Sequence, residues 1–553
     1  MTGTTSRSAI AAGRLVESLE QLGAELVFGL PGVHNLPIWK ALSASDIRLV
    51  GVRHEQTAVY AADGYARATG RLGVAVVTTG PGAANTLGAT GEAMAASSPV
   101  LVIATDTASS LRREGVYRGT LHETRDQTAM FVPVTKAARA VGAAAEIAGA
   151  VLESGALALT ASTGPVYLGV PTDLLSTVVS GAALASETHV PASDPQPTEA
   201  ALGRASELLA GAARPLIWAG GGALRADAGP VVGELAVKLA APVVTTFMGR
   251  GLLSPEHPCA VPGPAHAPEV GALWDEADVV LAIGSDFDGT NTQNWRMPPP
   301  PTLIAVNVDE ADANKSYRCD LTVTGDARAV LERLIPRVTP RAGLAELERR
   351  LAAIGAAVAA WVHNDDEQVT QFLEVIHRAL APETVVVTDM CIPGYWLAGY
   401  WRVPRPRKLA YPLGWGTLGF GFPASLGAAL AGAGPTVCVC GDGGFMYACG
   451  ELATVVQEGI PVTIVLVDDG GYGMLRFDQI LAGEEPFGVD LVVPDVVALA
   501  ASFGVPARTV NGFGPDFEQA LRAAIDTAEP NVIVVNAALK PPPTTSPRWY
   551  RKP

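Results

Sequence analysis

The chain contains 553 residues, of which 48% are hydrophobic and 17% charged, and its formal net charge is −16. A chain of this length can form about three domains with substantial cores. The acidic balance and the lack of a basic patch in the sequence argue against nucleic acid and acidic membrane surfaces as partners.

The N-terminal part, residues 1–180, is predicted to form a doubly wound parallel sheet. Residues 8–24 carry apolar side chains at helical spacing with charges between them, which indicates an amphipathic helix rather than a signal peptide. No apolar run long enough to span a membrane is free of Gly, Pro or charge. Strands are expected in the apolar runs at residues 26–28, 47–52, 74–78 and 99–104. Their alternation with turns and helices indicates an α/β domain.

Glu55 follows the second of these strands and precedes a helix predicted over residues 57–69. Ligands collect at the carboxyl ends of parallel strands, so Glu55 is a candidate catalytic residue. The alternative is that Glu55 has a purely structural role, because the helix dipole favours a carboxylate in the first turn of any helix. His34 and His122 could relay protons because imidazole titrates near neutral pH, but a lone histidine is usually structural, and the case for both rests on the resemblance described below. His54 is expected to be a packing residue that points the other way.

A Ser- and Pro-rich linker at residues 179–200 leads into a central domain, residues 195–340. Its predicted strands alternate with helices in a Rossmann-like pattern, at residues 215–219, 242–246, 278–283 and 302–308. The turn Gly220-Gly221-Gly222 could meet a nucleotide phosphate, but a glycine turn after a strand is ordinary and only Arg225 is a nearby cation. A second linker at residues 336–343 and a long helix to about residue 361 precede the third domain, residues 365–553, which ends in a proline-rich tail.

The third domain contains a predicted strand at residues 436–440, the turn Gly441-Asp442-Gly443-Gly444, a helical stretch at residues 447–458 and a strand at residues 461–467. Asp468 and Asp469 follow that second strand. Two carboxylates at neighbouring strand ends repel each other unless a hard cation lies between them and a phosphate completes its shell. A metal-dependent phosphate site is therefore expected, although Gly-Asp-Gly alone also suits any sharp turn. The six cysteines show no metal-ligand spacing, and reduced thiols in a cytoplasmic protein are expected.

The Gly441-Asp442-Gly443 turn and the later acidic pair resemble the thiamine-diphosphate fingerprint, in which Gly-Asp-Gly precedes an Asn-Asn pair. The segments at residues 53–58, 79–82 and 413–424 resemble acetolactate synthase-like enzymes that use this cofactor. The resemblance implies three doubly wound parallel-sheet α/β domains, which bind the pyrimidine, form a central Rossmann-like unit and bind the diphosphate.

The same resemblance implies roles for individual residues. Mg²⁺ is expected on Asp442, Asp469 and the Gly471 carbonyl, and Glu55 is expected to hydrogen-bond the aminopyrimidine ring. Leu418 is expected to wedge between the two rings of the cofactor. The implied cofactor contacts are Glu55, Gly80, Pro81, Leu418, Gly441, Asp442, Gly443, Gly444, Asp469 and Tyr472. Because the cofactor of this family lies between two chains, a homodimer or homotetramer is expected.

Several segments depart from the acetolactate synthase pattern. Asp468-Asp469 replaces Asn-Asn and adds negative charge, and residues 389–394 lack a Gln-His pair, so backbone amides at residues 443–445 are expected to bind more of the diphosphate. Residues 261–266 and 285–289 differ from the FAD-binding motifs of acetolactate synthases, which weakens the expectation that the chain binds FAD. Residues 476–478 stand where acetolactate synthases have a Trp-Glu pair, which weakens the expectation that acetolactate is the product.

Residues 31–34 and 119–123 are more similar to 5-guanidino-2-oxopentanoate decarboxylases and to benzaldehyde lyase. The expected activity is thiamine-diphosphate- and Mg²⁺-dependent decarboxylation of a 2-oxo acid, followed by aldehyde release or by carboligation to an aldehyde acceptor. An acyloin lyase, a non-catalytic paralogue and a nucleotide- or CoA-dependent variant are the alternatives. The expected substrate pocket consists of His34, His122, Trp415, Tyr472, Met474 and Phe477.

Overall fold

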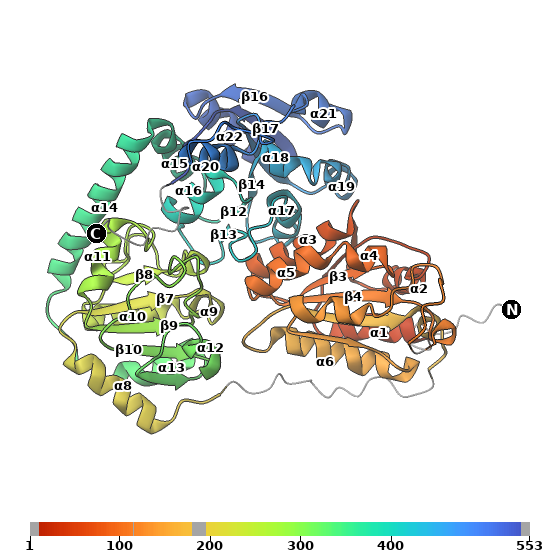
Figure 1. Ribbon diagram of the computed structural model, residues 1–553, viewed down its shortest axis with the longest axis horizontal. Coiled ribbons are helices and arrows are strands. Elements are labelled where there is room, and N and C mark those ends of the chain that lie inside the picture. Colours follow the sequence, from red (N-terminus) through yellow and green to blue (C-terminus); the bar gives the residue numbers. More distant parts are fainter. Residues whose placement is uncertain (1–9, 114, 180–194, 543–553) are drawn as a thin grey trace.

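The computed structural model describes residues 10–113, 115–179 and 195–542. It contains three parallel sheets, each flanked by helices, and this confirms the predicted α/β fold with three doubly wound parallel sheets (Figure 1). Residues 180–194 of the linker predicted at residues 179–200, and the tail after residue 542, lie outside the described residues, while α8 begins at Glu199 within that predicted linker. None of the described helices is long and apolar enough to cross a membrane.

The first sheet has six strands in the order β2-β1-β3-β4-β6-β5. Four of its strands fall on the predicted apolar runs, and β5 and β6 were not predicted. The strands are β1 Leu26–Gly29, β2 Arg48–Gly51, β3 Gly73–Val77, β4 Val100–Asp106, β5 Ala137–Ala140 and β6 Val166–Pro171. The helices are α1 Ala11–Gln21, α2 Leu36–Leu42, α3 Glu55–Thr69, α4 Pro81–Ala84, α5 Leu87–Ala95, α6 Ile147–Leu159 and α7 Thr172–Leu175.

The central sheet has five strands in the order β11-β10-β9-β7-β8. The strands are β7 Pro215–Ala219, β8 Val243–Thr245, β9 Val279–Ile283, β10 Leu303–Asn307 and β11 Leu321–Thr324. The helices are α8 Glu199–Gly211, α9 Gly221–Arg225, α10 Gly229–Leu239, α11 Pro268–Glu276, α12 Glu310–Asn314 and α13 Ala327–Leu334. Helices α14 (Leu344–Asp365) and α15 (Glu367–Ala379) follow along the outside and lead into the third sheet (Figure 1).

The third sheet has six strands in the order β13-β12-β14-β15-β17-β16. The strands are β12 Val385–Thr388, β13 Leu409–Ala410, β14 Thr436–Gly441, β15 Val462–Asp468, β16 Ala507–Asn511 and β17 Asn531–Asn536. The helices are α16 Ile392–Tyr400, α17 Gly421–Leu430, α18 Asp442–Met446, α19 Leu452–Glu458, α20 Gly473–Leu481, α21 Val496–Ser502 and α22 Pro515–Asp526. The helical stretch predicted at residues 447–458 is confirmed over α19 and is wrong before it: α18 starts directly after β14 and ends at Met446, and a short 3₁₀ turn with Gly450 precedes α19.

The first and third domains pack through α3 and α17 (Figure 1). A Cβ atom on Gly64 would overlap the Ala424 carbonyl, and one on Gly427 would overlap the Ala61 carbonyl, so glycine permits this backbone approach. Buried Arg67 strengthens the contact, because it pairs with Asp63 and Glu92 of its own domain and donates to the Tyr411 carbonyl of the other. Apolar residues of both domains accordingly belong to one continuous core.

Candidate active site

Glu55 is the first residue of α3, at the carboxyl-end side of the first sheet. It is buried, with 9% of its surface exposed, and Asn85 Nδ2 donates to its Oε2 at 3.0 Å. A Cβ atom on Gly82 would lie 3.4 Å from Oε1, so glycine leaves space beside that oxygen. His54 is exposed, and its Nδ1 accepts from Gln56 N–H at 3.2 Å as the cap of α3. The expectation that His54 packs is therefore wrong, because the helix needs an acceptor at that position.

His34 and His122 lie next to each other, with ring centroids 5.4 Å apart in an edge-to-face arrangement. His34 Nδ1 is 2.7 Å from Thr79 Oγ1, which in turn bonds Thr105 Oγ1 at 3.0 Å. Burial lowers the pKa of His34, and the nearby His122 lowers it further. His122 Nδ1 is buried and has no hydrogen-bond partner among the described residues. The fold thus brings together two histidines that are far apart in the sequence.

Gln127 holds the turn at Gly80, which lies against His122, and no role was predicted for it from the sequence. Its Oε1 accepts from Gly80 N–H at 2.7 Å, and its Nε2 donates to the Thr105 carbonyl and to Tyr167 Oη. Gly80 has φ +65° and lies directly against the His122 backbone. A buried glutamine in a poorly patterned loop offers no signal in the sequence.

Asp442 and Asp469 lie at the carboxyl ends of the neighbouring strands β14 and β15. Asp442 is buried, its Oδ1 accepts from Gly443 N–H at 2.7 Å, and its Oδ2 has no hydrogen-bond partner among the described residues. Burial raises the pKa of Asp442 to about 7, and the negative charges of Asp469 and Asp468 add to the rise. Burial likewise raises the pKa of Asp469. The Gly471 N–H lowers both pKa values, which indicates that both carboxylates face the same turn.

These carboxylates fit a divalent cation. A buried carboxylate oxygen without a partner is costly, and a second carboxylate beside it increases the cost, whereas a cation would offset both effects. No cluster of three or more His, Cys, Asp or Glu side chains suited to a metal occurs in the described part of the chain. Further ligands would therefore come from backbone or cofactor oxygens.

Tyr472 and Asp389 frame the glycine turn after β14. A Cβ atom on Gly443 would lie 2.8 Å from the Tyr472 ring, and one on Gly444 would lie 2.8 Å from Asp389 Oδ2. Residues 389–394 stood out in the sequence only because they lack the Gln-His pair of acetolactate synthases, and no role was predicted for Asp389. The structure instead gives its carboxylate hydrogen bonds from Met390, Gly419 and Gly421 N–H.

The remaining predicted pocket residues lie in two places. Leu418 is half-buried in the segment before α17, and Trp415 of the same segment is 54% exposed and lies against Gly91 of α5. Met474 and Phe477 lie on α20, a helix with no buried residue whose Leu475, Ile480 and Leu481 side chains are exposed. The described contacts of one chain thus leave α20 with an uncovered apolar face.

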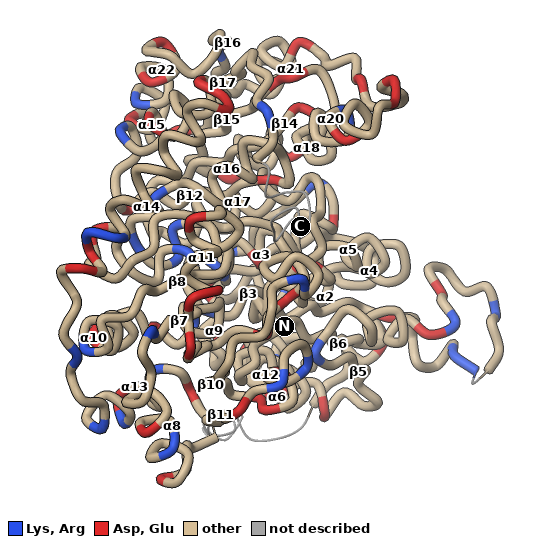
Figure 2. The backbone as a smooth tube through the Cα atoms, turned by 60° about the vertical axis from the view of Figure 1, so that its left-hand side comes forward, with Lys and Arg blue, Asp and Glu red and all other residues tan. Residues whose placement is uncertain are grey.

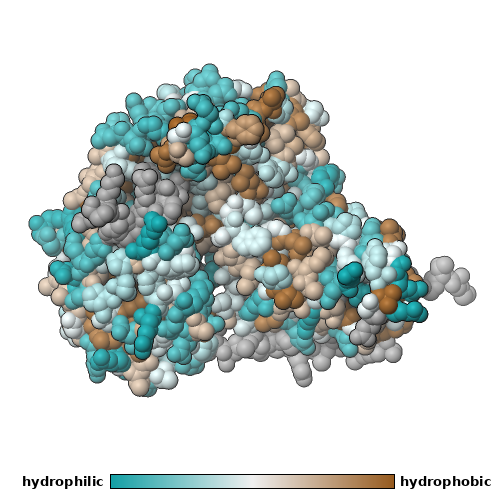
Figure 3. All heavy atoms as spheres, viewed as in Figure 1, coloured by the Kyte–Doolittle hydropathy of each residue, from teal (hydrophilic) through white to brown (hydrophobic). Residues whose placement is uncertain are grey.

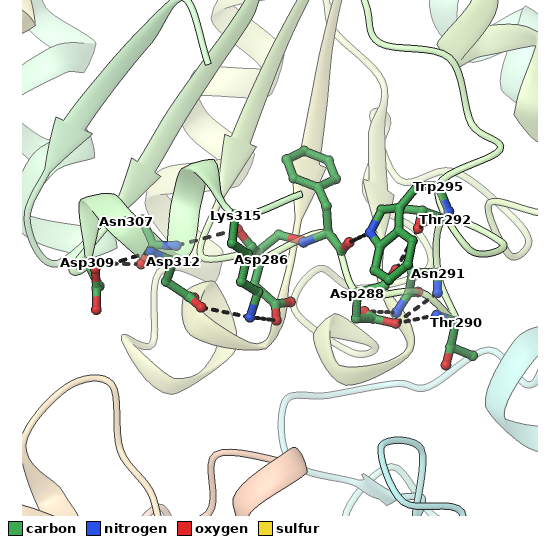
Figure 4. A network of polar contacts seen from close by, with 12 residues as sticks. Asp286, Asp288, Thr290, Asn291, Thr292, Trp295, Asn307, Asp309, Asp312 and Lys315 are labelled. Carbon is green, nitrogen blue, oxygen red and sulfur yellow. Dashed lines mark hydrogen bonds and ion pairs between the residues drawn. The ribbon is translucent and has the colours of Figure 1, made fainter. Parts of the chain in front are cut away.

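The central domain has a crowded acidic network at the carboxyl ends of β9 and β10 (Figure 4). Lys315 pairs with Asp286 at 2.7 Å and with Asp312 at 2.8 Å, and Asp288 bonds Asn291. The turn at Gly220–Gly222 is used internally, since Gly220 N–H donates to Ile283 and Gly222 N–H donates to Gly284. Gly220 and Gly222 therefore serve close packing against the end of β9.

The two groups of candidate residues share no polar contact within the described part of one chain. No hydrogen bond or ion pair among the described residues joins Glu55, His34 or His122 to Asp442 or Asp469. Part of the segment after β4 projects from the body of the chain (Figure 2), whereas His122 lies against Gly80, and apolar patches are exposed over both terminal domains (Figure 3). The exposed apolar residues include Val33, Leu36, Leu121, Tyr447, Leu475 and Phe487.

Three family models match the chain in order. Residues 11–130 match the N-terminal TPP binding domain of thiamine pyrophosphate enzymes, residues 202–334 match the central domain and residues 389–535 match the C-terminal TPP binding domain. A probable 2-ketoarginine decarboxylase of Pseudomonas aeruginosa is 36% identical, over 93% of this chain and 92% of its own. An acetolactate synthase large subunit of Corynebacterium glutamicum is 32% identical, over 90% of this chain and 82% of its own length. A probable acetolactate synthase large subunit of Methanocaldococcus jannaschii is 31% identical, over 94% of this chain and 91% of its own length.

Proposed function

The chain belongs to the thiamine pyrophosphate enzyme family, and on that premise we propose that it is a Mg²⁺-dependent enzyme that decarboxylates a 2-oxo acid. The observation that carries the metal-dependent part is the buried Asp442 Oδ2, which has no partner among the described residues and shares its turn with Asp469. When bound, thiamine diphosphate supplies a carbon nucleophile and an electron sink for cleavage beside a carbonyl.

The residues of the third domain would hold the cofactor. Asp442 and Asp469 would bind Mg²⁺, with the Gly471 carbonyl as a proposed third ligand, and the metal would bind the diphosphate. The backbone N–H groups of Gly444 and Phe445, in α18 directly after β14, would bind the diphosphate. Asp389 fixes the segment that carries Leu418, which would determine the conformation of the bound cofactor.

Glu55 would hold a proton for the aminopyrimidine. Its Oε2 already accepts from Asn85, so Oε1, beside Gly82, is the atom that remains for a ring nitrogen. His34, with its lowered pKa, is neutral near pH 7 and would accept a proton from the substrate or return one to the product.

We propose a homodimer as the minimum unit, with the cofactor between the N-terminal domain of one chain and the C-terminal domain of its partner. Two features support this arrangement. Among the described residues, no hydrogen bond or ion pair joins Glu55 to Asp442, and α20 carries exposed apolar residues beside the predicted pocket. Large exposed apolar patches usually mark an interface.

The central domain is proposed to work without FAD. Its acidic network would repel a diphosphate, and Lys315 is already paired with two aspartates. The amides of Gly220 and Gly222 are occupied by internal hydrogen bonds.

The test is cofactor-dependent CO₂ release from pyruvate, phenylpyruvate, benzoylformate and 5-guanidino-2-oxopentanoate. The last acid is included because the name of the Pseudomonas relative specifies a 2-ketoarginine substrate. Release from at least one acid that requires Mg²⁺ and thiamine diphosphate, and that falls at least 100-fold in Glu55→Gln, is expected. Release that does not depend on Glu55 would contradict the proposal.

A second set with benzaldehyde as acceptor separates simple decarboxylation from carboligation. The close His34–His122 pair favours one further candidate, the cleavage of an acyloin, because two imidazoles could serve a hydroxyl and a carbonyl together. Benzoin as sole substrate tests it. Benzaldehyde release without CO₂ release from any of the four acids would favour the lyase over the decarboxylase.

A further inference from the structure

A mostly apolar cavity of about 320 Å³ lies between the central domain and the helices that lead into the third domain. Its wall is formed by the segment after β8, by α14 and α15, and by residues 400–403 after α16. The apolar lining includes Val243, Leu253, Val358, Val362, Leu373 and Val403. Its volume is within the range of small-molecule sites, which starts at roughly 300 Å³. None of the candidate active-site residues lines it.

Arg250 places an unbalanced positive charge in this cavity. Its Nη2 donates to the Trp401 carbonyl at 2.5 Å, while its Nε is buried and has no hydrogen-bond partner among the described residues. Within those residues Arg250 forms no ion pair with a carboxylate. Burial lowers the pKa of Arg250 to about 10, and the Tyr400 hydroxyl opposes the fall. A buried guanidinium with an unused donor is costly unless an anion pairs with it.

Other polar residues line the cavity, on its inner wall and at its solvent side. Thr370 Oγ1 of α15 is also buried without a partner in the described structure. Glu374, His377 and Arg402 line the cavity but are exposed, so they mark its solvent side. Arg402 is paired with Glu256 at 3.2 Å, so its charge is balanced. Among the described residues, the unpaired Arg250 Nε–H and Thr370 hydroxyl therefore lie in a mostly apolar setting.

We propose that this cavity binds an amphipathic monocarboxylate, with its carboxylate on Arg250 and its hydrocarbon body against the apolar lining. The planar guanidinium matches a carboxylate, and its unused Nε–H is a strong donor to one. A single inner cation suits one negative charge rather than a phosphate dianion. The Thr370 hydroxyl adds a second donor for the same head group.

Calorimetric titration of the full-length protein with octanoate tests this, with 1-octanol as the uncharged probe of equal chain length. Octanoate is expected to saturate at one molecule per chain and to bind at least tenfold more tightly than 1-octanol. Arg250→Met is expected to weaken octanoate at least tenfold and to leave 1-octanol binding within threefold. Arg402→Met makes the same charge change at the exposed side and is expected to leave octanoate affinity unchanged.

Val358→Phe provides a test that does not alter Arg250. It fills the cavity from α14 and is expected to abolish the binding of both probes in a protein whose melting temperature shows that it is folded. The proposal is wrong if folded wild type binds no octanoate at millimolar concentration, if octanoate and 1-octanol bind equally, or if octanoate binding survives Val358→Phe or Arg250→Met.

Discussion

Both carboxylate oxygens of Asp389 accept from the Gly419 N–H, at 3.1 and 3.0 Å. The same group accepts from Met390 N–H at 2.7 Å and from Gly421 N–H at 3.3 Å, and it is buried. Burial raises its pKa to about 6, and the backbone N–H groups oppose that rise. The end of β12 thus fixes the segment that carries Leu418, from within the third domain.

Asp389→Asn is expected to destabilise the protein by about 1–3 kcal/mol at pH 7.5, because the amide NH₂ would face backbone N–H donors and lose charge-assisted bonds. Thiamine-diphosphate affinity is expected to fall as well, since the Leu418 segment is less fixed. Denaturant unfolding and cofactor titration measure the two effects. Asp516→Asn, an exposed change in the same domain, is the control. An Asp389→Asn variant as stable as wild type would show that Asp389 does not hold the segment.

Gly427→Ala is expected to destabilise the protein by about 2–5 kcal/mol, because the added methyl group would overlap the Ala61 carbonyl in the α3–α17 contact. Gly149→Ala is the matched control, since that glycine lies in α6 with nothing near its missing Cβ. The control is expected to be neutral or to gain up to about 1 kcal/mol from helix propensity. Thermal unfolding of both variants compares them, and equal effects would contradict the close approach.

The metal proposal makes Mg²⁺ affinity depend on pH. Asp442 has a pKa raised to about 7, so below pH 7 it holds a proton that Mg²⁺ must displace. Affinity is therefore expected to increase from pH 6 to pH 7 by up to about tenfold and to level off above pH 8. Asp468→Asn removes one of the charges that raise this pKa, so the curve is expected to move to lower pH. Calorimetry with Mg²⁺ and thiamine diphosphate measures it, and a pH-independent affinity would exclude Asp442 as a ligand.

The His34–His122 contact makes a prediction for the pH profile of kcat/KM. Burial first and His122 second lower the pKa of His34, so His34 is protonated only below its ordinary pH range. His122→Gln removes the second cause, and the pKa of His34 is expected to rise. The acidic limb of the profile should then move to higher pH. An unchanged limb in an active His122→Gln enzyme would show that His34 does not control it.

Much of the fold was predictable because buried parallel strands are continuous apolar runs. The strands at Pro215–Ala219 and Thr436–Gly441 fall on such runs. The order of the three domains was implied by the resemblance to acetolactate synthase-like enzymes. The strand Ala137–Ala140 was missed because it is short, Ala-rich and only half-buried. Helix α18 was missed because its sequence, Asp442-Gly443-Gly444-Phe445-Met446, has the composition of a turn.

The candidate site was predictable where chemistry follows a strand end, as at Glu55 and Asp442. It was not predictable where a long-range contact gives a residue its role. Asp389 acquires its partners only when the segment 30 residues later folds against it. Arg250 is one arginine among many until the helices after the central domain enclose it.

The most direct test of a site shared between two chains is co-expression of Glu55→Gln and Asp442→Asn subunits with different tags. Each single variant is expected to be nearly inactive alone. A mixed dimer with shared sites has one doubly altered site and one intact site, so random pairing should restore about a quarter of wild-type CO₂ release, and purified mixed dimers about half. Mixed dimers that form but stay inactive would show that Glu55 and Asp442 act within the same chain and would contradict the proposed arrangement.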